Sequence, residues 1–124
     1  IDMCSMGILF MNLGFQSIIF IDKNYVKHSI YRRKMPLFTK RGGLLISEAI
    51  RMSDIRKLLA GEYPIILNIE NASGGGHYVV VRGVGRKMMT ISCPRYGLKK
   101  RSIKNIMKAC YNWSGGAILA RPSN

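Results

Sequence analysis

Residues 76–83 read Gly-His-Tyr-Val-Val-Val-Arg-Gly, and this stretch decides the expected fold. Its three consecutive valines are typical of a buried β-strand, because β-branched side chains pack well on a pleated sheet. A polar, glycine-rich turn at residues 71–76 separates it from an earlier apolar run at 65–69. A further run at 88–92 follows after a short turn. Three such runs with short connections predict a β-meander.

Helices are expected before and after this meander in the sequence. The apolar stretch 3–13 stops at Gly14, a residue type that often ends helices, so we predict a buried helix there. Ser53 is expected to begin a second helix that ends at Gly61. Ser102 should cap a third helix, whose apolar residues recur at helical spacing: Ile103, Ile106, Met107 and Cys110.

The remaining segments complete an α+β pattern. Residues 17–21 and 117–120 are expected to be short strands, and the basic, irregular region 23–43 a surface loop with a short strand or helix inside it. Helices followed by mainly antiparallel strands predict one α+β domain over residues 1–124, with the N-terminal helix packed on a small antiparallel sheet. The chain begins at Ile1, so we expect the N-terminal part of this domain to be incomplete.

Charge is the unusual feature of the composition. The chain has 20 Lys and Arg against 6 Asp and Glu, a formal net charge of +14. Such a field attracts phosphate backbones and acidic partners. Basic residues cluster around the last helix and, with Tyr96, are expected to form either an anion-binding face for nucleic acid or an acidic protein, or a solvated face: Arg95, Lys99, Lys100, Arg101, Lys104 and Lys108.

Cysteine usage predicts reduced thiols and no metal site. Cys4, Cys93 and Cys110 cannot all pair, and their spacing matches no metal knuckle, so a reducing, cytoplasm-like compartment is favoured. His28 has no second ligand at metal spacing, and we expect no metal or cofactor. The apolar stretch 6–21 is interrupted by polar residues and is too short for a membrane span, which needs about 18 residues.

His77 is the main candidate for a catalytic residue. A histidine at the start of a buried strand is held rigidly, and Gly75 and Gly76 before it would let a substrate backbone approach. The alternative interpretation is a strand-end histidine without a catalytic task.

The stretch Gly76-His77-Tyr78-Val79-Val80-Val81 resembles the corresponding strand of the bacteriocin-processing (double-glycine leader) peptidases, a papain-like cysteine-peptidase family. The pattern of helix, turn and strand over 54–69 and the closing Trp-Gly stretch 113–122 are similar to that family as well. The resemblance implies a papain-like fold with His77 as general base. It also implies contacts between an extended peptide substrate and three residues: Gly75, Gly76 and Tyr78.

The chain departs from the family pattern at the other catalytic positions. Cys93-Pro94 stands where the family has an Asp-Pro whose carboxylate orients the histidine, and a thiol is a weak acceptor. An ungapped comparison puts Ile1 at the nucleophile position, with Cys4 one helical turn further on. No glutamine precedes Cys4 to stabilise an oxyanion.

Three hypotheses therefore remain open. The first is a degenerate peptidase-type domain, a pseudoenzyme that binds an extended peptide. The second is an active cysteine peptidase (a hydrolase) that uses Cys4 and His77, against which stands the interpretation of Cys4 as a buried core cysteine. The third is a basic binding module for nucleic acid or an acidic protein partner.

Overall fold

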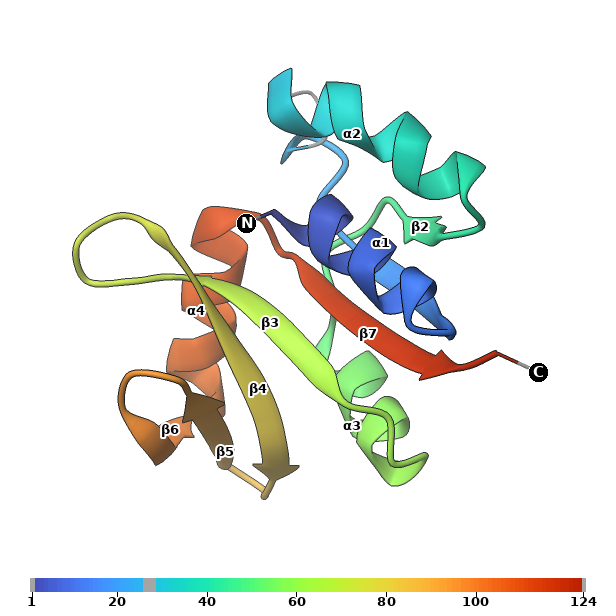
Figure 1. The fold of residues 1–124 in the computed structure, drawn as a ribbon. Helices are drawn as coiled ribbons and strands as arrows, with labels where there is room; N and C mark the ends of the chain where they lie inside the picture. Colours follow the sequence, from blue (N-terminus) through green and yellow to red (C-terminus); the bar gives the residue numbers. More distant parts are fainter. Residues whose placement is uncertain (1, 26–28, 124) are drawn as a thin grey trace.

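The protein folds around one mixed sheet, seen in a computed structural model that describes residues 2–25 and 29–123 (Figure 1). The helices and strands follow one another as α1 (Met3–Asn12), β1 (Phe15–Phe20), α2 (Ser29–Lys40), β2 (Leu44–Ile46), α3 (Met52–Ala60), β3 (Ile65–Glu70), β4 (Gly76–Val84), β5 (Met88–Cys93), β6 (Gly97–Ser102), α4 (Ile103–Trp113) and β7 (Ala117–Pro122).

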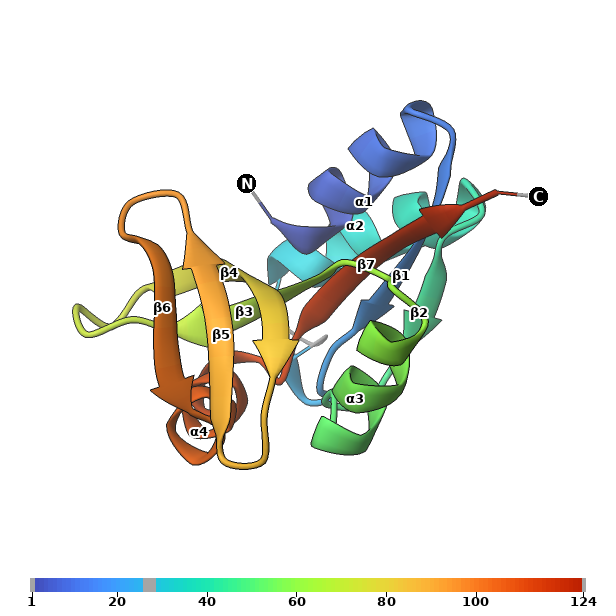
Figure 2. The ribbon, with the colours of Figure 1, turned by 90° about the horizontal axis from the view of Figure 1, so that it is seen from below.

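The sheet has the strand order β2-β1-β7-β3-β4-β5-β6. Every neighbouring pair is antiparallel except β1 and β2, which run parallel. Helices α1 and α2 lie on one side of the sheet, and α3 and α4 on the other (Figure 2). The predicted α+β class and the meander of β3, β4 and β5 are confirmed.

Alternation along the strands divides the core into two clusters, one on each face of the sheet. Val79 and Val81 of β4 belong to the cluster under α3 and α4, together with Ile106 of α4. Ile19 of β1 and Ile118 of β7 belong to the cluster under α1 and α2. Each of the central strands β1, β7, β3 and β4 therefore contributes side chains to both clusters.

Capping residues set two helix boundaries as expected and one differently. Gly14 follows α1 with a φ of +94°, and the Ser102 hydroxyl accepts a hydrogen bond from the Asn105 amide at 3.0 Å. The prediction that Ser53 begins α3 was wrong, because the helix starts at Met52. The Asp54 carboxylate accepts from the backbone amide of Arg51 at 3.0 Å, which moves the boundary toward the N-terminus.

The region 23–43, expected to be a surface loop with a short strand or helix inside it, contains a twelve-residue helix, α2. Its Tyr31, Met35 and Phe38 are spaced by four and three residues, which places them on one buried stripe. Pro36 lies inside the helix and cannot donate a backbone hydrogen bond. Burial of the apolar stripe outweighs that loss. The many basic residues of the segment made a helix of this length hard to predict from the sequence.

Strands β2 and β6 at the two edges of the sheet were not predicted. Strand β6 has the sequence Gly-Leu-Lys-Lys-Arg-Ser, which lacks an apolar pattern, and its pairing with β5 holds it in place. The stretch 6–21, expected not to cross a membrane, forms most of α1, a turn and β1. Within the described residues, no helix has the length and apolar character for a membrane span.

Phe38 joins α2 to the rest of the core and makes a stability test. Its ring lies against Gly7 and Gly43, where any added Cβ would come within 2.5 Å of ring carbons. Phe38→Ala should lower the free energy of unfolding by about 3–5 kcal/mol, as for other buried phenylalanines. Chemical denaturation followed by circular dichroism measures this.

Leu37 is the matched control, because it is adjacent to Phe38 in α2 but 58% exposed. Leu37→Ala should change the free energy of unfolding by no more than about 0.5 kcal/mol. Equal losses in the two variants would contradict the described packing of α2.

Candidate functional site

The structure brings His77 and Cys93 together at one end of the sheet. His77 Nε2 lies 2.9 Å from Cys93 Sγ, in a contact where the ring tautomer decides which group donates. His77 begins the buried part of β4, and Cys93 ends the neighbouring strand β5. Because Cys93 holds the ring at Nε2, proton exchange with any further group would use Nδ1.

A cavity of about 350 Å³ lies beside His77. Its walls come from two turns at the same end of the sheet, residues 71–73 between β3 and β4, and Arg95 with Tyr96 between β5 and β6. We call this end of the sheet, where β3 and β5 finish and β4 and β6 begin, the His77 end. The cavity combines an imidazole, a guanidinium and a phenol, groups that suit a polar or anionic part of a ligand.

Cys4 and His77 do not meet, although sequence reasoning paired them as a catalytic dyad. Cys4 belongs to the cluster under α1 and α2, to which Tyr78 adds its ring. His77 precedes Tyr78, so strand alternation directs the imidazole to the face of Val79, under α3 and α4. The sheet therefore separates the two residues.

The surroundings of Cys4 are those of a core cysteine. Its side chain is completely buried, and its thiol points to the Met35 sulfur at 3.5 Å. Burial, with a smaller contribution from the charge of Asp2, raises the pKa of the Cys4 thiol to about 12. A thiol in this state is a poor nucleophile at neutral pH. Ile1, which the ungapped comparison put at the nucleophile position, lies outside the described residues.

The glycines before His77 accommodate the protein's own side chains. A Cβ on Gly76 would lie 2.6 Å from the indole nitrogen of Trp113, so this tryptophan fills the space that was expected to admit a substrate backbone. Gly75 belongs to the turn, where its amide donates to the side-chain oxygen of Asn71 at 3.0 Å. Close approach of a substrate to Gly76 would require Trp113 to move.

A second cavity of about 260 Å³ lies at the His77 end on the opposite face, under the start of α1. Sequence reasoning missed it, apart from Gly76 and Tyr78, because its walls come from five separate segments of the chain. We call it the Trp113 pocket, and its polar and aromatic walls are Asp2, Tyr25, Tyr31, Asn68, Tyr78 and Trp113. The one sequence signal was Asn68, a polar residue inside the apolar run of β3.

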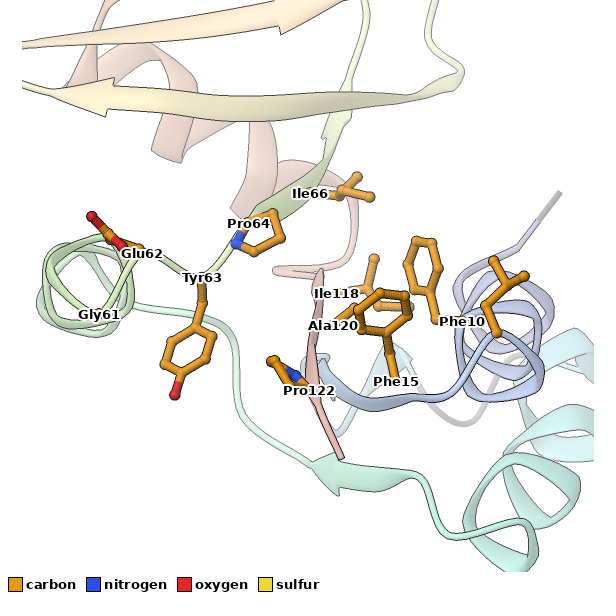
Figure 3. Close-up of a pocket in the computed structure, with 11 residues that line it drawn as sticks. Phe10, Phe15, Gly61, Glu62, Tyr63, Pro64, Ile66, Ile118, Ala120 and Pro122 are labelled. Carbon is orange, nitrogen blue, oxygen red and sulfur yellow. The ribbon is translucent and has the colours of Figure 1, made fainter. Parts of the chain in front are cut away.

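The largest cavity, about 650 Å³, is apolar and lies at the other end of the sheet (Figure 3). Phe10 and Phe15 form one side and Tyr63 with Pro64 the other, while Ile118 lies between them. Pro64 precedes β3, whereas His77 pairs with the last residues of that strand. The apolar pocket is therefore not continuous with the His77 end.

The predicted basic cluster occupies the edge strand and the start of α4. Lys99 Nζ lies 4.4 Å from the centre of the Tyr96 ring, and the Arg95 guanidinium carbon lies 5.5 Å from it. Exposed basic side chains continue from there through β6 into α4: Lys100, Arg101 and Lys104. Arg95 and Lys99 are thus at the His77 end, and the positive charge continues along β6 toward the opposite end of β5. We call this row of basic residues the basic border.

Comparison with protein-family models and with curated proteins gave no match for this chain. The described residues also contain no group of three or more His, Cys, Asp or Glu side chains placed to hold a metal ion. His28, considered above as a metal ligand, lies outside the described residues. Function must therefore be argued from the site itself.

Thiol reactivity tests the separation of Cys4 from His77. Burial raises the pKa of both Cys4 and Cys110 to about 12, so at about pH 8 the thiolate fraction is on the order of one in ten thousand. Iodoacetamide should therefore leave both residues unmodified in the native protein and modify both after unfolding. Mass spectrometry of the proteolytic peptides measures this. Rapid alkylation of native Cys4 that His77→Ala abolishes would restore the dyad.

Proposed function

We propose that this chain is a papain-like cysteine-peptidase-type domain that binds an extended peptide at the His77 end and does not hydrolyse it through Cys4. The observation that carries the proposal is the 2.9 Å contact between His77 and Cys93. The family resemblance pairs the histidine with the residue at the position of Cys93, and these two residues are in contact.

The same contact argues against efficient proton transfer. A carboxylate at the position of Cys93 would stabilise a protonated imidazole, whereas a neutral thiol is a weak acceptor and carries no charge. Cys4 is buried on the other face of the sheet. Peptide binding without hydrolysis therefore fits the described residues better than an active Cys4–His77 peptidase.

The cavity beside His77 gives the peptide a place to bind. Arg95 would meet a carbonyl or carboxylate of the peptide, since a guanidinium donates paired hydrogen bonds to such groups. Tyr96 offers a half-exposed aromatic surface on the same side. Because Trp113 covers Gly76, the peptide would pass on the His77 side of the turn rather than over the glycines.

A titration followed by nuclear magnetic resonance tests peptide binding. The probe is a synthetic extended peptide that ends in two glycines, the class that the family resemblance implies. Saturable shifts are expected for the amides of His77 and of residues 95–97, and the peptide should remain intact by mass spectrometry. Cleavage abolished by both Cys4→Ser and His77→Ala would instead support the active peptidase.

Two tyrosines serve as matched variants. Tyr96→Ala should weaken peptide binding about tenfold, because Tyr96 lines the cavity beside His77. Tyr63→Ala should leave binding unchanged, because Tyr63 lines the apolar pocket at the other end of the sheet. The reverse result would move the peptide site to the apolar pocket, and absence of any shift would remove peptide binding.

A second candidate function is binding of single-stranded nucleic acid by the basic border. The specific observation is Tyr96, an aromatic side chain accompanied by Lys99 and Arg95. Exposed aromatic rings beside cationic side chains are the usual platform on which single-stranded bases stack. Lys100 and Arg101 extend the positive charge along β6.

Salt dependence separates this function from non-specific attraction by the net charge. Binding of a single-stranded oligonucleotide should weaken with rising salt, with a slope of about −0.7 for each phosphate contact. Removal of one contact in Arg101→Ala should make that slope less steep by about 0.7. Lys57→Ala in α3 removes the same charge from an exposed position away from β6 and should leave the slope unchanged. Equal effects of both variants would indicate attraction by net charge alone.

A further inference from the structure

The Trp113 pocket contains a buried polar atom without a partner. Asn68 is 3% exposed, and its side-chain oxygen Oδ1 accepts no hydrogen bond from any described residue. The Asn68 backbone amide donates to the Gly116 carbonyl at 2.9 Å, which fixes this position of β3. An acceptor left unsatisfied in this way is energetically unfavourable, so its presence on a cavity wall points to a ligand that donates a hydrogen bond.

The other walls of the pocket are electron-rich. Tyr25 lies near the centre of the aromatic group, with its ring 5.5 Å from that of Tyr31 and 6.2 Å from that of Trp113, measured between centroids. Tyr78 is the cross-strand neighbour of Asn68 and adds a fourth ring on the same face. Faces of tyrosine and tryptophan rings attract cations through their quadrupoles.

Among the described lining residues, Asp2 carries the only formal charge, and it is negative. Its carboxylate caps α1 by accepting from the Ser5 amide at 2.9 Å and also accepts from Lys34 at 2.7 Å. Although burial alone would raise the pKa of Asp2, the hydrogen bonds from Lys34 and Ser5 lower it on balance, so the group stays ionised. Lys34 neutralises much of this charge, so the rings and Asn68 must supply most of the attraction.

Ligand classes can be compared against these walls. An anion would lie beside the Asp2 carboxylate and the unpaired side-chain oxygen of Asn68, both of which repel it. An apolar group would leave Asn68 Oδ1 unsatisfied. An ammonium ion is compact and strongly hydrated, whereas a guanidinium is planar, weakly hydrated and rich in N–H donors, and it stacks on aromatic rings. The cavity is also smaller than the roughly 300–1,000 Å³ of sites for drug-sized ligands, which favours a single functional group.

We propose that the Trp113 pocket binds a guanidinium group, which stacks on Tyr25 and Trp113 and donates a hydrogen bond to Asn68 Oδ1. The group belongs either to an arginine side chain of a peptide or to a free small guanidinium compound. The proposal does not depend on peptide binding beside His77, because the two cavities lie on opposite faces of the sheet.

Fluorescence provides a direct test, because Trp113 is the single tryptophan of the chain. Methylguanidinium represents the free compound and Nα-acetyl-arginine amide the peptide side chain. Saturable changes in Trp113 emission are expected with at least one of them. The probe that binds more tightly indicates whether the natural ligand is a free guanidinium compound or an arginine side chain of a peptide. Nα-acetyl-citrulline amide has nearly the same shape without the charge and should bind at least tenfold more weakly.

Variants decide whether the binding occurs in this pocket. Asn68→Leu removes the acceptor and should weaken binding about tenfold or more, and Tyr25→Leu should weaken it through loss of a ring. Asn105→Leu at an exposed position of α4 and Tyr63→Leu in the apolar pocket are the matched controls and should have no effect. Circular dichroism verifies that each variant is folded. Equal binding of citrulline, unchanged affinity in both pocket variants, or no emission change with either guanidinium probe would each overturn the proposal.

Discussion

The pairing of β3 with β4 is the constraint on which both cavities at the His77 end depend. This pairing aligns Asn68 with Tyr78 and Ile69 with His77. Consecutive residues of a strand point to opposite faces, so one pair faces the helices α1 and α2 and the other faces α3 and α4. A shift of the register by one residue would exchange the faces and destroy both sites. The contact of His77 with Cys93 and the position of Asn68 on the wall of the Trp113 pocket thus both follow from the pairing of β3 with β4.

Trp113 closes this end of the sheet. It ends α4, lies against Gly76 where no larger residue would fit, and reaches Tyr25 from a distant segment. Gly76 has no Cβ, and the indole ring of Trp113 packs in the space that a Cβ would fill. The group that comes close to this glycine is therefore part of the protein itself. The same contact brings the end of α4, the start of β4 and the segment after β1 into one wall. A residue that resembles part of a substrate channel in sequence thus has a packing role in the fold.

The two faces of the His77 end have opposite electrostatic character. Arg95 and Lys99 surround Tyr96 on the border of the cavity beside His77, and a positive edge strand follows. Asp2, Asn68 and aromatic rings line the pocket on the other face. The two cavities of a protein with a formal net charge of +14 thus have different polar groups on their walls. The net charge alone does not show where the charges lie, because it is the sheet that places these groups on different faces.

Local chemistry in the sequence determined the α+β class, the meander and most helix ends. Three valines, a glycine turn and caps such as Ser102 act over a few residues, and the fold retains them because burial on the sheet supports the same choices. Tertiary structure alone decided the rest. Helix α2 forms because Phe38 is buried against Gly7, which is distant in sequence, and β6 forms because β5 pairs with it. The sequence marked His77, Cys93 and Cys4 as candidates, but which of them meet depends on the face to which each side chain points. That face is set by strand pairing between distant residues, so the sheet brings His77 to Cys93 and separates both from Cys4.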